Sequence, residues 1–268
     1  MKGFILSFRS EFYKSRKTAG FWSAVILPLL LCLLIFAGFY SRSDKMVMEP
    51  PGMILWAQFS GAILGVMGSL LLPMLIVFIG YSVNSIEHKA DTWKTLFSLP
   101  ISKFSVYSAK YFYALFLVFL CLALFVLFTI GFGNLLGTVK PGLKFHDYNM
   151  SGTLSQLYFK LFLSSLGILS IQFLLSLLFR DFLKPMGIGF VATITGVILV
   201  VNQWKYDYLF PYSHPMLALS ALPQRHNHPA GNNPISVDIF TQEIYVSMII
   251  AAVVFIAGYF IVLKKSVK

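Results

Sequence analysis

The stretch EHKADTWKTLFSLP, residues 87–100, is a charged segment that lies between two long apolar runs. Apolar residues at positions 86, 90, 93 and 97 recur at intervals of four, three and four. That spacing places them on one face of a helix, with the polar and charged residues elsewhere around it. We therefore expect a short amphipathic helix to which a soluble partner can bind.

The composition around this segment is that of an integral membrane protein. Of the 268 residues, 57% are apolar and 12% are charged, whereas about a quarter of the residues in a soluble domain are charged. The net charge of +11 is concentrated beside the apolar runs, where lysine and arginine set membrane orientation. This placement argues against nucleic acid as a partner.

Six segments are apolar and long enough to cross a bilayer, which takes roughly 20 residues of helix. We predict an all-α fold with an N-terminal unit over residues 1–20 and a six-span transmembrane domain over 21–268. The expected spans cover residues 21–40, 60–83, 106–136, 156–179, 185–203 and 244–263.

The distribution of basic residues predicts the orientation of the spans. If the N-terminus lies inside, fourteen lysines and arginines fall on the inner side, six fall on the outer side, and Lys160 falls within a span, which accounts for all 21. Cytoplasmic segments carry the excess of basic residues. Both termini and the segment 87–100 are therefore expected in the cytoplasm.

The first twenty residues have the pattern of an amphipathic helix. Phe4, Phe8 and Phe12 repeat every four positions, and basic residues such as Arg9 and Lys14 supply the opposite character. We expect a helix that lies in the membrane interface. The alternative is a basic flank that only orients the first span.

The last outer connection, about 204–243, contains an apolar run that is too short to cross the membrane. Runs of this length more often dip into the bilayer or lie in its interface. We expect a short re-entrant or interfacial helix over 215–222, beginning at Pro215 because proline is tolerated in a first helical turn. A plain surface loop is the alternative.

No catalytic site can be recognised, and we expect no bound cofactor. A phosphate-binding loop, which needs a glycine-rich turn followed by lysine and serine or threonine, is missing, so any ATP would be bound by another chain. His226 and His228 are the only hint of a metal site, and two histidines in such a loop are more often solvated. We therefore expect neither a catalytic residue nor a metal ligand.

Ionisable residues are nearly absent from the interior of the predicted spans, which argues against an ion-driven transporter. Lys160 lies near an outer span end, where its side chain is expected to reach the headgroups. Ser165, Gln172 and Ser176 form a polar stripe along the fourth span. The stripe either lines a translocation route or hydrogen-bonds to a neighbouring helix, and the second is the more common arrangement.

The segment 87–103 resembles the cytoplasmic loop of the type 2 exporter permeases of ABC transporters. In that family the loop between the second and third spans reads as glutamate, then threonine with a hydrophobic residue, then leucines that end in proline and a basic residue. Here these elements are Glu87, Thr92-Trp93, Leu96, Leu99-Pro100 and Lys103. His88 and Lys89 depart from the family pattern, which often has arginine there.

The resemblance implies a coupling helix that docks on a cytoplasmic ABC ATPase. Its residues would be Glu87, Asp91, Thr92, Trp93, Leu96 and Pro100, with Trp93 as the anchor in a partner pocket. The alternative for Trp93 is a position at the lipid headgroups. Pro100 would end this helix and Ser102 would cap the third span.

The resemblance also implies the assembly: a pair of ATPase subunits and a second permease, either identical or related, in a bacterial cytoplasmic membrane. The aromatic third span suits a hydrophobic or amphipathic cargo, and the layout is similar to permeases that expel lantibiotics or bacitracin-like peptides. Lipid, drug or ion export is the alternative within the family. The rival outside it is a non-transporting membrane scaffold that recruits a cytoplasmic partner.

Overall fold

The computed structural model describes the chain except for residues 1, 47–52, 93–95, 97–99, 221–236 and 265–268. Within hydrocarbon every backbone amide and carbonyl must find its partner inside the protein, and a helix meets this need within one segment. All regular elements of the described residues are helices, and six of them are long and apolar enough to cross a membrane. The predicted fold class is confirmed.

The helices that form five of these six spans are longer than the sequence predicted, and the helix of the fifth span has the predicted length. Their bounds are α2 (Ala19–Met46), α3 (Met53–Val66) continued by a π-helical turn (Met67–Leu71) and α4 (Leu72–Ala90), α6 (Lys103–Val139), α7 (Ser151–Leu178), α8 (Leu183–Val201) and α10 (Gln242–Lys264). The second span therefore ends at Ala90 rather than Val83, because its helix continues through the polar residues that were assigned to a separate segment.

Shorter helices flank the spans. The N-terminal α1 (Lys2–Ser15) is followed by α2, and single turns at Pro141–Leu143 and Phe145–Asp147 lie between α6 and α7. Between α8 and α10 come two single turns, Asp207–Leu209 and Pro211–Ser213, and then α9 (His214–Leu219). The predicted short helix near Pro215 is thus present; it begins one residue earlier and ends three residues earlier than expected.

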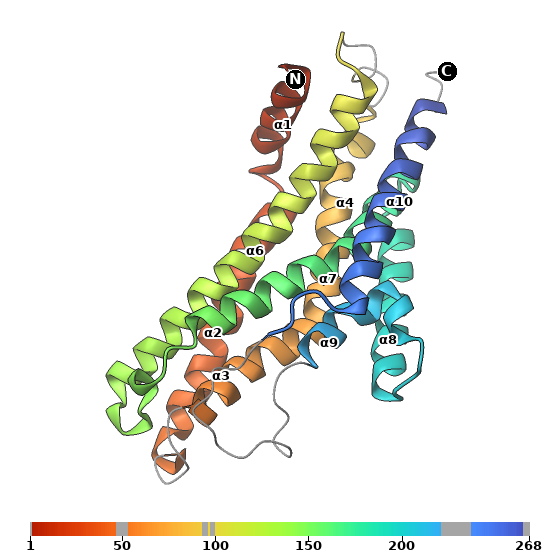
Figure 1. The fold of residues 1–268 in the computed structure, drawn as a ribbon. Helices are drawn as coiled ribbons and strands as arrows, with labels where there is room; N and C mark the ends of the chain where they lie inside the picture. The colour runs from red at the N-terminus through yellow and green to blue at the C-terminus, as the bar shows by residue number, and fades with distance from the viewer. Residues whose placement is uncertain (1, 47–52, 93–95, 97–99, 221–236, 265–268) are drawn as a thin grey trace.

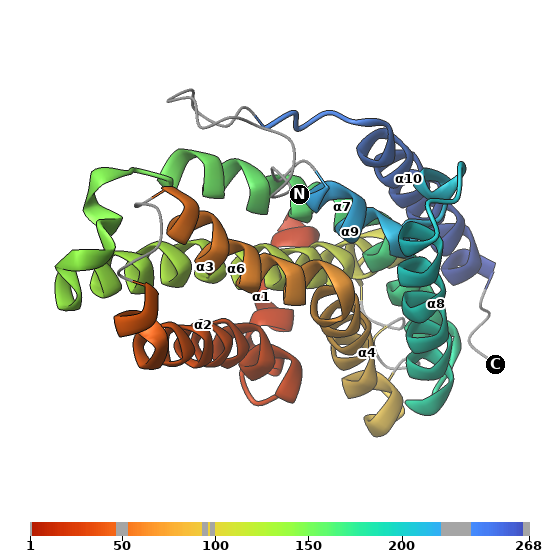
Figure 2. The ribbon, with the colours of Figure 1, turned by 90° about the horizontal axis from the view of Figure 1, so that it is seen from below.

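The long helices form a tilted bundle in which both termini and the connection between α4 and α6 lie at the same end (Figure 1). Seen along the bundle, α2 lies on one side and α8 and α10 on the other (Figure 2). The second span and α7 are the most buried of the spans. These central helices are therefore the ones that can carry polar side chains away from lipid.

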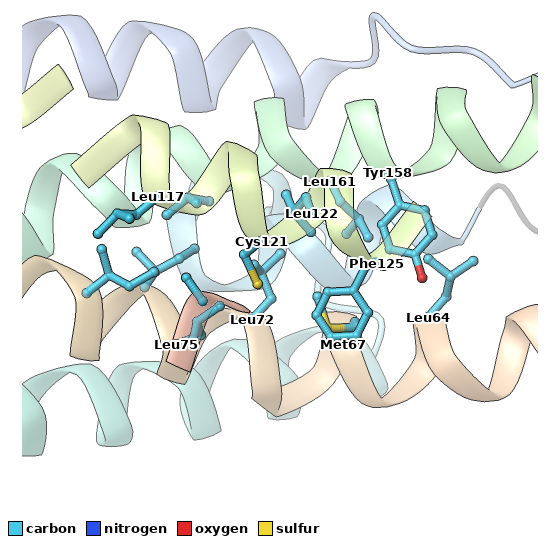
Figure 3. Packing of buried hydrophobic residues seen from close by; sticks show 14 of the residues in the cluster. Leu64, Met67, Leu72, Leu75, Leu117, Cys121, Leu122, Phe125, Tyr158 and Leu161 are labelled. Atoms are coloured by element: carbon cyan, nitrogen blue, oxygen red, sulfur yellow. The ribbon is translucent and has the colours of Figure 1, made fainter. Parts of the chain in front are cut away.

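The core lies where the second, third and fourth spans meet, and its side chains are apolar and closely packed (Figure 3). Leu64, Met67, Leu122, Phe125 and Leu161 are among its fully buried or nearly fully buried members. Because lipid is as apolar as these side chains, close packing rather than hydrophobicity holds membrane helices together.

Glycine allows one of the closest approaches in the bundle. A Cβ atom on Gly133 of α6 would lie 2.2 Å from Cη2 of Trp56. The indole of Trp56 is held in place by its Nε1–H, which donates to the carbonyl oxygen of Phe145 at 2.8 Å. Only glycine at this position leaves room for the ring.

The π-helical turn lies directly before Pro73, which explains why the helix departs from α geometry there. Proline has no N–H to donate, and its ring clashes with the carbonyl four residues earlier. The amide of Leu72 bonds to the carbonyl oxygen of Met67, a five-residue step that accommodates this conflict. The short helix α9 packs against the same turn, where a Cβ on Gly68 would meet Leu219.

Candidate functional site

The charged segment begins inside the second span rather than after it. Glu87 and His88 belong to the last turn of α4, and the left-handed backbone of Asp91, with φ of 48°, ends that helix. The single helical face predicted over residues 86–97 is therefore interrupted at Asp91. Beyond it the amide of Leu96 donates to the carbonyl oxygen of Thr92 at 2.9 Å.

Glu87 lies in a cluster of four charged residues that joins three helices. Lys110 of α6 extends its ammonium between two carboxylates, at 2.6 Å from Glu87 and 2.9 Å from Glu11 of α1, and 3.3 Å from the carbonyl oxygen of Val83. Lys14 of α1 bridges the same carboxylates at 3.1 and 3.3 Å. Two positive and two negative charges balance within the cluster.

Burial makes this cluster energetically sensitive. The side chains of Lys110, Glu11 and Glu87 are at most 2% exposed, whereas that of Lys14 is 34% exposed. Charges removed from water are tolerated only when they are paired, and removal of one partner leaves another uncompensated. Burial alone would lower the pKa of Lys14, but the carboxylates of Glu11 and Glu87 raise it above the ordinary value.

These contacts correct the expectation that ionisable residues are nearly absent from the spans. Lys110 lies near the start of the predicted third span, yet its side chain is fully buried. The signal that could have found the cluster is a lysine within the apolar run of the third span, since such residues mark functional positions in membrane proteins. Glu87 holds helices of its own chain together through both carboxylate oxygens, so it positions the segment that follows it.

The other predicted coupling residues are distributed around the end of α4. Asp91 and Thr92 are exposed, Leu96 is half-buried, and Pro100 is exposed just before α6. Trp93, the predicted anchor, lies outside the described residues. An exposed ion pair at 3.6 Å links Asp91 to Arg180 in the α7–α8 connection, and surface pairs of this kind contribute little to stability.

The start of α6 agrees with the sequence. Ser102 has an extended backbone, and its hydroxyl accepts the amide of Ser105 at 3.2 Å. This satisfies one of the free amides at a helix start. The predicted N-cap is confirmed.

The aromatic face of α1 packs against α6. Phe4 makes an edge-to-face contact with Phe112 at 6.0 Å between ring centroids, and Phe8 and Phe12 both contact Tyr113. The face expected to enter the bilayer interface is thus covered by protein in part. Large side chains exposed on the remaining surface of α1 are Ile5, Leu6 and Tyr13.

The polar stripe of α7 is buried between helices. The hydroxyl of Ser176 donates to the carbonyl oxygen of Gly80 and accepts from the side-chain amide of Asn84, both at 2.8 Å. The side-chain amide of Gln172 donates to the hydroxyl of Tyr212 at 2.5 Å, whereas the hydroxyl of Ser165 bonds within its own helix. The bonds of Ser176 and Gln172 join α7 to neighbouring elements, which is one of the two arrangements that the sequence left open; a role in lining a route stays a prediction.

At the opposite end of the bundle, Lys160 does not extend to the headgroups. Its side chain is 2% exposed, and its ammonium lies 3.4 Å from a carboxylate oxygen of Glu243 in α10. The prediction placed Lys160 at the lipid headgroups because the residue lies near a predicted span end, whereas its actual partner is 83 residues away in the sequence. No local pattern indicates such a pair.

His214 begins α9 in the same outer region and is fully buried. Its Nε2 faces the carbonyl oxygen of Tyr208 at 2.8 Å. Burial lowers the pKa of His214, although the Tyr208 carbonyl and the charges of Glu243 and Asp207 act in the opposite direction. The neutral imidazole is therefore favoured in the folded chain.

Among the described residues, no group of three or more histidine, cysteine, aspartate or glutamate side chains is placed to hold a metal. His226 and His228 lie outside those residues. At the start of α7 the side-chain oxygen of Asn149 accepts the backbone amide of Ser151 at 3.0 Å.

Six helices long and apolar enough to cross a membrane, with buried charges that join α1, α4 and α6 at one end of the bundle, define the chain as a helical membrane domain. The chain belongs to a family described as ABC-2 family transporter protein, whose model matches residues 7–196. It is thus a membrane-spanning subunit of an ABC transporter. The match covers α1 to most of α8, including the charged cluster. Neither a curated protein nor a solved structure matches this chain.

Proposed function

We propose that this chain is the permease subunit of an ATP-driven exporter and that a separate ATPase docks on residues 91–100. The family membership supports a partner ATPase, since this family supplies the membrane-spanning subunit. The observation that carries the docking site is the charged cluster. It joins the end of α4 to α1 and α6 directly before the proposed docking segment.

The charged cluster provides a route by which a displacement of the docking segment would reach other helices. Glu87 precedes the segment by one helical turn, and Lys110 of α6 and Lys14 of α1 bind its carboxylate. A displacement of residues 91–100 is resisted at Glu87 and is therefore passed to α1 and α6 together. Closure of two ATPases on ATP would favour one arrangement of the spans, and ADP release would favour the other.

The proposed orientation places both termini and residues 91–100 in the cytoplasm of a bacterial cell, with the protein in the cytoplasmic membrane. Its support is the excess of lysine and arginine on that side and the arrangement of both termini and the α4–α6 connection at one end (Figure 1). The exposed apolar side chains Ile5 and Leu6 suit α1 to the bilayer interface at this end.

The proposed assembly is two permeases, identical or related, and two ATPases. The proposed cargo is a hydrophobic or amphipathic molecule, with an antimicrobial peptide as the first candidate and a lipid, drug or ion as alternatives. The support is the aromatic-rich α6, although many of its rings pack against α1 and α10.

Copurification with an ABC ATPase encoded beside this chain tests the proposal. Trp93→Ala is expected to weaken ATPase binding and to lower the stimulation of ATP hydrolysis at least tenfold, since a buried aromatic anchor contributes about 2 kcal/mol or more. Trp204→Ala is the matched control, because Trp204 is 47% exposed at the other end of the bundle.

Equal effects of the two substitutions would refute the docking site. An ATPase that binds without any change in its hydrolysis or in transport would favour a scaffold over a permease. Glu87→Ala is a poor probe of docking, because it also breaks the buried cluster.

A further inference from the structure

A hollow of about 320 Å³ lies beside α9, at the end of α10 that is farther from the C-terminus. It is formed where the start of α10 and Lys160, the tenth residue of α7, approach α9 and the Asp207–Leu209 turn. The lining residues are Lys160, Asp207, Tyr208, Leu217, Ser220, Asp238, Thr241, Gln242 and Glu243. Its size is at the lower end of the range for small-molecule sites.

The wall of this hollow holds a buried ammonium with spare hydrogen-bonding capacity. The Lys160 side chain is 2% exposed, and its ammonium has three N–H donors. Within the described residues its charge is met by Glu243 at 3.4 Å, which is long for a charge-assisted hydrogen bond. A buried ammonium with unused donors is costly, so an anionic group in the hollow would stabilise it.

A bound cation would also stabilise the carboxylates that line the hollow. Asp207, Asp238 and Glu243 supply three negative charges against the single positive charge of Lys160, which leaves a net charge of −2. The hydroxyl of Thr241 donates to one oxygen of Glu243. Asp207 is half-buried and Asp238 is exposed, so both remain open to a ligand that enters from the aqueous side.

We propose that this hollow binds a small zwitterion, a phosphate joined to a primary ammonium as in a phosphoethanolamine group. The phosphate would lie at Lys160, since lysine binds phosphate as a point charge, and the ammonium would lie at the carboxylates, which accept charge-assisted N–H bonds. A quaternary choline group has no N–H to donate and a glycerol headgroup has no cation, so both fit less well.

The position of the hollow suits a lipid headgroup as one source of this zwitterion. Glu243 is the second residue of α10, so the hollow opens at the level where that span begins and where headgroups lie. A soluble phosphoethanolamine compound has the same chemistry. The site is independent of the proposed export function, because it rests on the outer residues alone.

Two binding measurements on the purified full chain test the proposal. In detergent, calorimetric titration compares glycerophosphoethanolamine with glycerophosphocholine and glycerophosphoglycerol. Native mass spectrometry then records which diacyl lipid the chain retains from an equal mixture of the three headgroup classes. We expect at least a tenfold preference for ethanolamine in one or both measurements.

Variants connect that preference to the hollow. Asp238→Asn is expected to lower ethanolamine affinity about tenfold, and Asp207→Asn to act in the same direction. Asp147→Asn is the matched control, because Asp147 is an exposed outer carboxylate that does not line the hollow. Unchanged melting temperatures show that the variants are folded.

The possible outcomes identify the source of the zwitterion or refute the proposal. Selectivity in both measurements assigns the site to the headgroup itself, and selectivity of the diacyl form alone assigns it to membrane lipid. Selectivity of the soluble compound alone assigns it to a soluble zwitterion. Equal binding of all three headgroups in both measurements, or equal effects of Asp238→Asn and Asp147→Asn, would overturn the proposal.

Discussion

Lys110→Met removes the central cation of the buried cluster while keeping a side chain of similar length. In the folded chain the ammonium of Lys110 contacts Glu87 at 2.6 Å, Glu11 at 2.9 Å and the Val83 carbonyl at 3.3 Å. Without it, two carboxylates that are 2% exposed share only Lys14, whose side chain is 34% exposed. One negative charge is then left unbalanced in the interior.

The expected loss of stability follows from that imbalance. Breaking a buried ion pair by removing one partner costs about 3–5 kcal/mol. A change of 1 kcal/mol shifts the melting temperature of a chain of this size by about 2–4 °C, so the expected decrease is about 6–20 °C. The additional change Glu87→Gln should recover part of the loss, because it removes the excess negative charge.

Melting of the purified protein in detergent, followed by tryptophan fluorescence, measures this effect. Lys184→Met is the matched control, because the 3.2 Å pair of Lys184 with Asp181 is exposed and such pairs contribute at most about 1 kcal/mol. A melting temperature of Lys110→Met within 2–3 °C of the parent, or equal to that of Lys184→Met, would show that the cluster is not a stabilising unit.

Two further substitutions test the packing of α6 and the outer helix α9. Gly133→Ala should lower the free energy of unfolding by about 1–3 kcal/mol, because the added Cβ would collide with Trp56. The control Gly131→Ala, with open space around it, should be neutral or stabilising by up to about 1 kcal/mol. Equal denaturation midpoints of the two variants would refute the contact. Burial lowers the pKa of His214 in the folded chain. As the pH falls through about 6.5, this histidine therefore takes up a proton in the unfolded chain before it does so in the folded chain. Stability should therefore decrease as the pH falls from 7.5 to 5.5. The decrease should be smaller in His214→Gln than in the parent protein or in the exposed control His146→Gln. A parallel decrease in all three proteins would contradict the lowered pKa of His214.

The six spans were predictable because a bilayer imposes one requirement on every segment that crosses it. Length and apolar composition were enough to place them, and the N-cap at Ser102 followed from local chemistry. The ends were harder to place. α4 continues to Ala90 because Glu87 is neutralised by Lys110 from another helix, and that compensation has no signature near residue 87.

The side-chain partners in the site were not predicted for the same reason, because they lie on other helices. Hydrogen bonds and ion pairs that join distant residues, such as Lys160 with Glu243 or Gln172 with Tyr212, depend on which helices become neighbours. A periodic pattern reports the face of one helix and gives no information about the facing helix. The polar stripe of α7 was therefore visible in the sequence, but its partners were not.

The π-helical turn at Met67–Leu71 lets the second span hold one residue more than a regular α-helix, because a π-helical turn closes over five residues where an α-helical turn closes over four. Removal of one residue from this turn would therefore restore a continuous α-helix and leave the side chains on both sides facing nearly the same way. Glu87 would still face Lys110, and Trp56 would still pack against Gly133. We therefore expect relatives that differ in length by one residue within this span to carry the difference at the turn, with no compensating change at the end of α4.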